Sequence, residues 1–94
     1  MFQIESTDEP TFRYRVLTLR GVRGASVIVK RYNMTHLKYL TVAQRDFESH
    51  VEADRASYTQ RQLLTCLAKL HGSNYVIREN EECHSPQLAL EIAA

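Results

Sequence analysis

The first third of the chain carries the apolar pattern of a β-hairpin. Residues 11–20 (TFRYRVLTLR) and 25–32 (ASVIVKRY) are rich in β-branched and aromatic side chains, which favour extended backbone. The four residues between them, GVRG, begin and end in glycine, which tolerates the positive φ angles that tight hairpin turns require. Residues 2–5 alternate apolar and polar positions and predict a short edge strand before the hairpin.

Between residues 35 and 71 the apolar spacing becomes that of helices. Gaps of three, four and four residues predict a first amphipathic helix, with a stripe formed by Leu40, Ala43, Phe47 and Val51. A leucine stripe predicts a second helix, which ends before Gly72, the usual position of a helix-terminating glycine. That stripe comprises Leu63, Leu64, Leu67 and Leu70.

Two further elements are predicted near the C-terminus. Residues 74–79 contain the apolar run Tyr75-Val76-Ile77, which predicts a strand. Ser85 and Pro86 precede QLALEIAA, and a cap followed by proline at the first helical position predicts a weak terminal helix.

These elements predict a single domain over residues 1–94, of the α+β class. We expect a small antiparallel sheet built on the β-hairpin, with two to three helices packed on one face, because strands that precede helices along the chain are typical of this class. In order, the segments are an acidic N-terminal segment (1–10), the basic hairpin (11–32), two helices (35–71), a strand (74–79) and an acidic tail with a candidate helix (80–94).

Alternation along the hairpin separates a core face from a second, mixed face. Phe12, Tyr14, Val16 and Thr18 share the first face, which we expect to be joined by Ala25, Val27 and Val29. The second face carries Arg13, Arg15, Leu17, Leu19, Ser26, Ile28, Lys30 and Tyr32. A domain this small has one core, so this second face is expected to stay wet unless a partner covers it.

The net charge of +1 hides a segregation of charge along the chain. Residues 1–9 sum to −3, residues 10–45 to +8 with no acid among them, and residues 46–94 to −4. A long one-signed stretch creates a local field that steers partners, even where the net charge is small. The alternative is an ordinary solvated basic surface, or one that the glutamates of the acidic tail cover within the same molecule.

The basic stretch alternates with tyrosines and predicts a binding surface. Cationic side chains neutralise phosphates, and aromatic or guanidinium planes stack on unpaired bases, so the expected partner is a ribonucleoprotein complex, single-stranded RNA or DNA, or an acidic protein surface. Tyrosine is also a favoured strand residue, which is the structural alternative. The predicted binding residues are Arg13, Arg15, Arg20, Arg23, Lys30, Arg31, Tyr32 and Lys38.

The residues that carry chemistry form no recognisable catalytic or metal-binding constellation. Cys83 and His84 are adjacent, and Cys66 and His71 are five residues apart, whereas structural zinc sites usually pair ligands across a short loop. No phosphate-binding glycine loop or nucleophile motif is present in the sequence. We therefore expect no enzyme activity, metal or cofactor, and expect Cys66 to be a small buried residue on the leucine face.

The composition also bears on where the protein works. No apolar run approaches the roughly 18 residues of a membrane helix, and the N-terminus MFQIESTDEP is acidic, unlike a secretory signal. The two cysteines are expected to be free thiols in a reducing compartment. These observations predict a cytoplasmic protein.

The short length, the mostly α+β element order, the lack of catalytic motifs and the charged hairpin over 11–32 together resemble small phage- and prophage-encoded inhibitors of host defence, especially anti-CRISPR proteins. The resemblance implies a non-enzymatic inhibitor in the bacterial cytoplasm. Such a protein would dock its basic hairpin on an RNA-containing or acidic assembly, such as a CRISPR surveillance complex, and block it sterically.

Two other functions remain open at this point. The first is a small DNA-binding regulator, because two helices over 41–71 would resemble a helix-turn-helix. The second is an assembly component whose open sheet edge pairs with a copy of itself.

Overall fold

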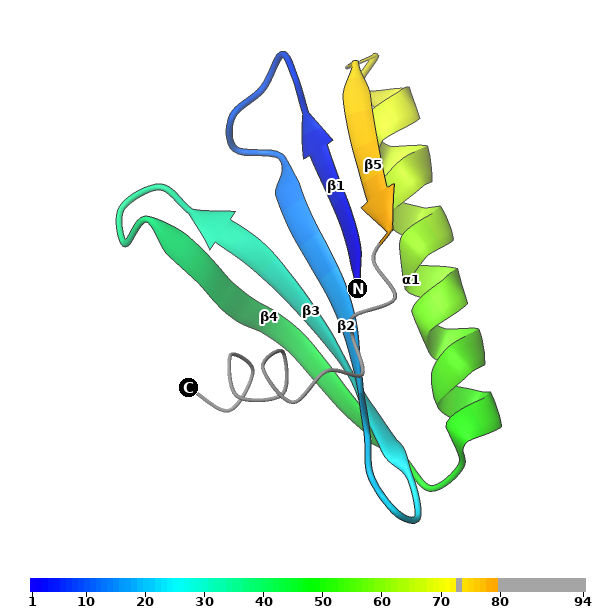
Figure 1. The fold of residues 1–94 in the computed structure, drawn as a ribbon. Helices are drawn as coiled ribbons and strands as arrows, with labels where there is room; N and C mark the ends of the chain where they lie inside the picture. Colours follow the sequence, from blue (N-terminus) through cyan, green and yellow to red (C-terminus); the bar gives the residue numbers. More distant parts are fainter. Residues whose placement is uncertain (73, 80–94) are drawn as a thin grey trace.

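The computed structural model describes residues 1–72 and 74–79, in which five antiparallel strands form one sheet and one helix covers a single face (Figure 1). The strand order across the sheet is β4-β3-β2-β1-β5. The elements are β1 (Phe2–Ser6), β2 (Arg13–Arg20), β3 (Ala25–Asn33), β4 (Lys38–Phe47), α1 (His50–Leu70) and β5 (Tyr75–Glu79).

Strands β2 and β3 form the hairpin predicted over 11–32. Thr18 pairs with Val27, and Arg20 pairs with Ala25. In this register the side chains of the two strands lie on the faces that were predicted for them. The Gly21 N–H donates to the Gly24 carbonyl at 2.7 Å and closes the turn. The short strand predicted over residues 2–5 is β1. The prediction that it forms an edge of the sheet is wrong, because it lies between β2 and β5.

The prediction of two to three helices is wrong, because the segment expected to form the first helix is strand β4. The pairing of β3 with β4 is interrupted between Val29 and Lys30, where Val42 is the extra residue of a β-bulge. A bulge shifts the side-chain alternation by one position, so Leu40 and Ala43 both lie on the α1 side although three residues separate them. The bulged strand therefore imitates the spacing of a helical stripe.

The single helix begins at His50, thirteen residues before the first leucine of the predicted stripe. The Ser49 side chain accepts hydrogen bonds from the N–H groups of Val51 and Glu52, an N-cap that satisfies amides left free at a helix start. At the other end Gly72 has φ +66° and its N–H donates to the Lys69 carbonyl, as predicted for a glycine that ends a helix. The terminal helix expected after Pro86 lies outside the described residues.

The core forms between α1 and the central strands, and small residues of the helix dominate its contact. The buried positions of α1 are Ala53, Ser57, Leu64 and Ala68, which pack over Phe2, Ile4, Val16, Val27 and Val29. The predicted leucine stripe is wrong as a core face, since Leu63, Leu67 and Leu70 are exposed. Cys66 is likewise exposed, because it lies on the same outer side of the helix.

We predict that Gly24→Ala destabilises the fold by about 1–3 kcal/mol. A Cβ at this position would collide with the backbone carbonyl of Phe47, where the hairpin turn approaches the end of β4. Urea denaturation measures the free energy of unfolding.

Gly21→Ala is the matched control from the same turn. Its Cβ would lie 3.4 Å from the Gly24 carbonyl oxygen, an ordinary contact, so we expect a change within about 0.5 kcal/mol. Equal effects of the two substitutions would show that the close approach at Gly24 is not what makes glycine necessary there.

Candidate functional site

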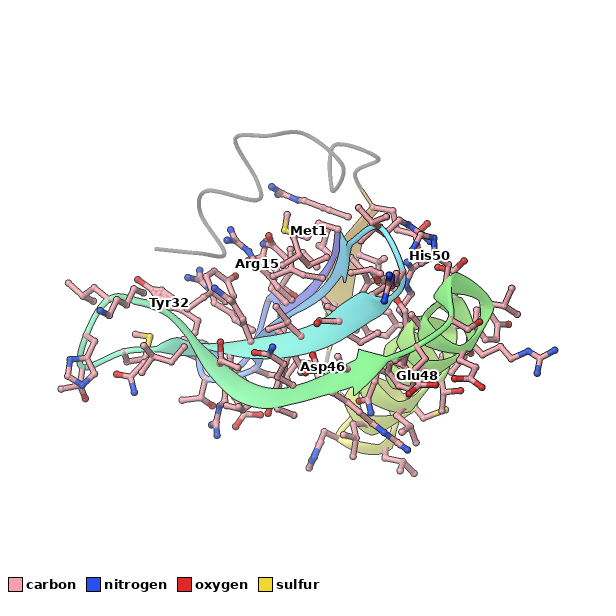
Figure 2. The ribbon with its side chains drawn as sticks, turned by 90° about the horizontal axis from the view of Figure 1, so that it is seen from below. Met1, Arg15, Tyr32, Asp46, Glu48 and His50 are labelled. Carbon is pink, nitrogen blue, oxygen red and sulfur yellow. The ribbon has the colours of Figure 1, made fainter. Side chains whose placement is uncertain are left out.

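The face of the sheet opposite α1, called the open face below, carries the mixed set of side chains predicted for the hairpin. The strand pairings place on it Arg13, Arg15, Leu17 and Leu19 from β2, and Ser26, Ile28, Lys30 and Tyr32 from β3. Figure 2 shows Arg15 on the side of the sheet away from the helix. Neighbouring strands add Gln3 and Glu5 of β1, Tyr39, Thr41, Gln44 and Asp46 of β4, and Val76 and Arg78 of β5.

Two arginines and two tyrosines pack together at one end of the open face, and we call them the arginine–tyrosine cluster (Arg13, Arg15, Tyr32, Tyr39). The guanidinium carbon of Arg13 lies 5.0 Å from the centre of the Tyr32 ring. That of Arg15 lies 3.8 Å from the centre of the Tyr39 ring. The two rings meet edge to face, 5.2 Å apart. The cluster thus presents alternating cationic and aromatic planes held by cation–π contacts.

Two residues of β1, Gln3 and Glu5, also contact the arginines of the cluster. The Nε–H of Arg15 donates to Oε1 of Gln3 at 3.1 Å. The Glu5 carboxylate lies between two guanidinium groups, 3.7 Å from Arg13 and 3.8 Å from Arg78. Glu5 therefore neutralises part of the positive charge of Arg13 and Arg78.

His50, the first residue of α1, contacts the turn of the hairpin. The Nε2 atom of His50 lies 3.0 Å from the Gly21 carbonyl oxygen and 3.1 Å from that of Gly24, so its N–H ties α1 to the hairpin turn. His36 is exposed in the turn between β3 and β4. Among residues 1–72 and 74–79, no group of three His, Cys, Asp or Glu side chains is placed to hold a metal ion.

The structure brings together only part of the predicted binding set. Arg13, Arg15, Lys30 and Tyr32 share the open face. Arg31 and Lys38 lie on the α1 side of the sheet, where Arg31 is opposite Tyr14. Arg20 forms an ion pair with Asp54 of α1, and Arg23 lies in the hairpin turn.

Sequence reasoning missed Tyr39 and Arg78 as members of this surface. The dipeptide Lys38-Tyr39 has the basic–aromatic pattern of the hairpin, but its assignment to a helix separated it from the sheet. Arg78 reaches the surface only because β5 pairs with β1, a long-range contact for which the local pattern holds no signal.

A groove lies on the side of the sheet that α1 covers. It is an apolar groove of about 520 Å³ between α1 and the outer strands, lined by Val27, Val29, Ala43, Phe47 and Ala56, among others. The groove exists because α1 packs mainly on β2 and β3 and leaves the outer part of β4 uncovered. Arg45, over the ring of Phe47 at 5.2 Å, lies at its border.

Comparisons with protein-family models, with curated proteins and with solved structures give no match to this chain. The resemblance to anti-CRISPR proteins therefore stays a prediction. In the part of the chain that the structure describes, α1 lacks the sustained apolar length needed to cross a membrane.

The arginine–tyrosine cluster should contribute measurable pairwise stability. We predict a coupling free energy of about 0.5–1 kcal/mol between Arg15 and Tyr39, the closer of its two cation–π pairs. A double-mutant cycle with Arg15→Met and Tyr39→Leu, followed by urea denaturation, isolates this pairwise free energy.

Arg31 and Tyr14 provide the control pair on the opposite face of the same strands. Their guanidinium-to-ring distance is 5.9 Å, so the same cycle with Arg31→Met and Tyr14→Leu should give a smaller coupling. A coupling at Arg15 and Tyr39 no larger than in this control would contradict an energetically significant cluster.

Proposed function

We propose that this protein is a non-enzymatic binding protein whose open face binds single-stranded nucleic acid. The observation that carries the proposal is the arginine–tyrosine cluster, in which two guanidinium planes and two partly exposed tyrosine rings occupy one end of the open face. Unpaired bases stack on such planes, and the adjacent cations neutralise phosphates.

The shape of the open face supports a single strand over a duplex. A sheet face offers stacking surfaces but no element that enters a groove, and duplex DNA is usually read by a helix or ribbon in the major groove. The two-helix segment over 41–71, on which a helix-turn-helix regulator depends, is not formed, because residues 38–47 are strand β4. On α1 itself Arg61 pairs with Glu79 at 3.1 Å, which reduces the positive charge of the helix.

We propose that the protein acts as a steric inhibitor of an RNA-containing assembly. A small basic face that holds the RNA of an RNA-containing assembly, such as a CRISPR surveillance complex in a bacterial cytoplasm, would exclude the nucleic acid that this assembly must bind. The support for this step is the localised charge of the hairpin, since a protein with net charge +1 is poorly suited to coating nucleic acid without selectivity.

We predict that the double variant Arg15→Glu/Lys30→Glu binds a 12-nucleotide single-stranded RNA at least about 30-fold more weakly than the natural sequence. Reversing two central cations removes phosphate contacts and adds repulsion, so the dependence of log affinity on log salt should also flatten, by a slope of about 1.4 for two contacts. Fluorescence anisotropy at two or more salt concentrations measures both quantities.

The matched control is Arg31→Glu/Arg45→Glu. These residues are exposed on the same sheet but on the α1 side, so the net charge changes equally while the open face is untouched. Equal loss in both double variants would assign binding to net charge alone and contradict the proposed face. Retained binding of acidic protein surfaces with no RNA affinity would identify the partner as protein instead.

We further predict that Tyr32→Leu/Tyr39→Leu weakens binding about 10-fold or more while leaving the salt slope unchanged. Removing rings eliminates stacking, worth about 1–3 kcal/mol per base, but no phosphate contact. The anisotropy titrations described above provide the measurement. A flattened salt slope in this variant would show that the rings act by positioning the cations rather than by stacking.

A further inference from the structure

The sheet is wider than the helix that packs on it. Five strands about 4.8 Å apart span about 19 Å between the axes of β4 and β5, whereas a helix with its side chains is about 10 Å across. Figure 1 shows α1 close to β4 where residues 48 and 49 join them, and diverging from β4 toward the other end of the sheet. We call the surface between them the wedge, and the apolar groove described above lies at its narrow end.

One wall of the wedge is an apolar row along α1. Ala56 and Gln60 line the groove. Leu63, Leu67 and Leu70 continue their row along the helix, because residues three and four apart lie on the same side. These leucines are 52%, 43% and 81% exposed. Alternating steps of four and three residues are the spacing by which one helix packs along another, and the row is about 21 Å long, the length of a helix of about 15 residues.

The opposite wall of the wedge is basic. Arg31, Lys38 and Arg45 lie on the α1 side of β3 and β4, and all three are exposed. The one acidic residue of these two strands, Asp46, lies on the open face, where it accepts a hydrogen bond from Ser26. Charge complementarity therefore favours a partner with acidic side chains along this wall.

We propose that the wedge binds an amphipathic helix of a partner protein. Its apolar side chains would pack against the leucines of α1 and the floor of the groove, and its acidic side chains would lie toward the cations of β3 and β4, which is the helix-in-groove mode of recognition. Two helices side by side have about the width of this sheet. The wedge and the arginine–tyrosine cluster are on opposite faces, so the inference does not depend on nucleic-acid binding, and one molecule could hold nucleic acid and protein at once.

A designed 15-residue peptide tests the site on the full-length protein. It carries leucine at alternating steps of four and three residues, glutamate along one flank and alanine elsewhere, with a fluorescent label for anisotropy. We expect it to bind at least about 10-fold more tightly than the same peptide with lysine in place of every glutamate, because the lysines would meet the cations of the wedge. Equal binding of the two peptides, or binding of neither, would overturn the proposal.

The apolar wall is tested with Leu63→Ser/Leu67→Ser. This variant should bind the acidic peptide at least about 10-fold more weakly, because apolar anchors dominate the affinity of such interfaces. The matched control is Val51→Ser/Tyr58→Ser, which removes two other exposed apolar side chains of α1 that do not line the groove. Circular dichroism verifies that each variant is folded. Equal losses in the two variants would assign binding to general hydrophobicity and contradict the site.

The basic wall is tested with Arg31→Glu/Arg45→Glu, which should also weaken binding of the acidic peptide at least about 10-fold. The control Arg15→Glu/Lys30→Glu changes the net charge equally but on the open face, so it should retain the peptide. Equal loss in both would assign binding to net charge and overturn the proposal. Since the open-face variant is the one expected to lose RNA, either proposal can fail while the other holds.

Sedimentation velocity of the protein alone tests whether a second copy occupies the wedge instead. We expect a monomer in the natural sequence and in Leu63→Ser/Leu67→Ser. A dimer that this variant dissociates would show that the leucines pair with those of another copy, and would overturn the assignment to a partner protein.

Discussion

The close packing of α1 on the inner strands is the constraint from which the remaining features follow. Ala53, Ser57 and Ala68 have small side chains, so the helix backbone lies near the sheet, and Ile4 becomes fully buried beneath it. A helix that approaches so closely covers the middle of the sheet and cannot also cover its full width. This packing determines which face of the sheet forms the core, and it leaves the outer part of β4 beside an apolar groove. The opposite face of the sheet is not covered by α1.

The open face combines two surfaces of different character. Toward the turn between β3 and β4 it is polar and stacked, with Arg13 and Arg15 over tyrosine rings. At its centre it is apolar, with Leu17 against Ile28. Interfaces commonly place an apolar centre inside a polar rim, and this face has that layout within one hairpin. The polar and the apolar parts of this face are therefore formed by neighbouring residues of the same two strands.

The sequence pattern predicts the hairpin and its faces well, because alternation along β2 and β3 is regular from Tyr14 to Arg20. It fails at β4, because the bulge at Val42 converts a two-residue period into a three-residue gap between Leu40 and Ala43. It fails again on α1, where the buried positions are mostly small and the exposed Leu63 and Leu67 carry the stronger apolar signal. The neighbours of β1 and β5 depend on pairings distant in sequence, so Arg78 could not be placed at the site. Tyr39 is missing from the predicted binding residues for a simpler reason: the sequence pattern predicts a helix where the structure has strand β4.

The bulge in β4 has a consequence for association as well as for prediction. Strand β4 is an edge of the sheet, ten residues long and largely exposed. The unpaired backbone groups of such an edge can pair with a strand of another molecule, so that sheets join edge to edge. The extra residue Val42 interrupts its regular row of amide and carbonyl groups near the middle, so an incoming straight strand would match the register on one side of the bulge and miss it on the other. The irregularity that makes β4 resemble a helix in the sequence thus also breaks the regular hydrogen-bonding edge that a long exposed strand would otherwise offer.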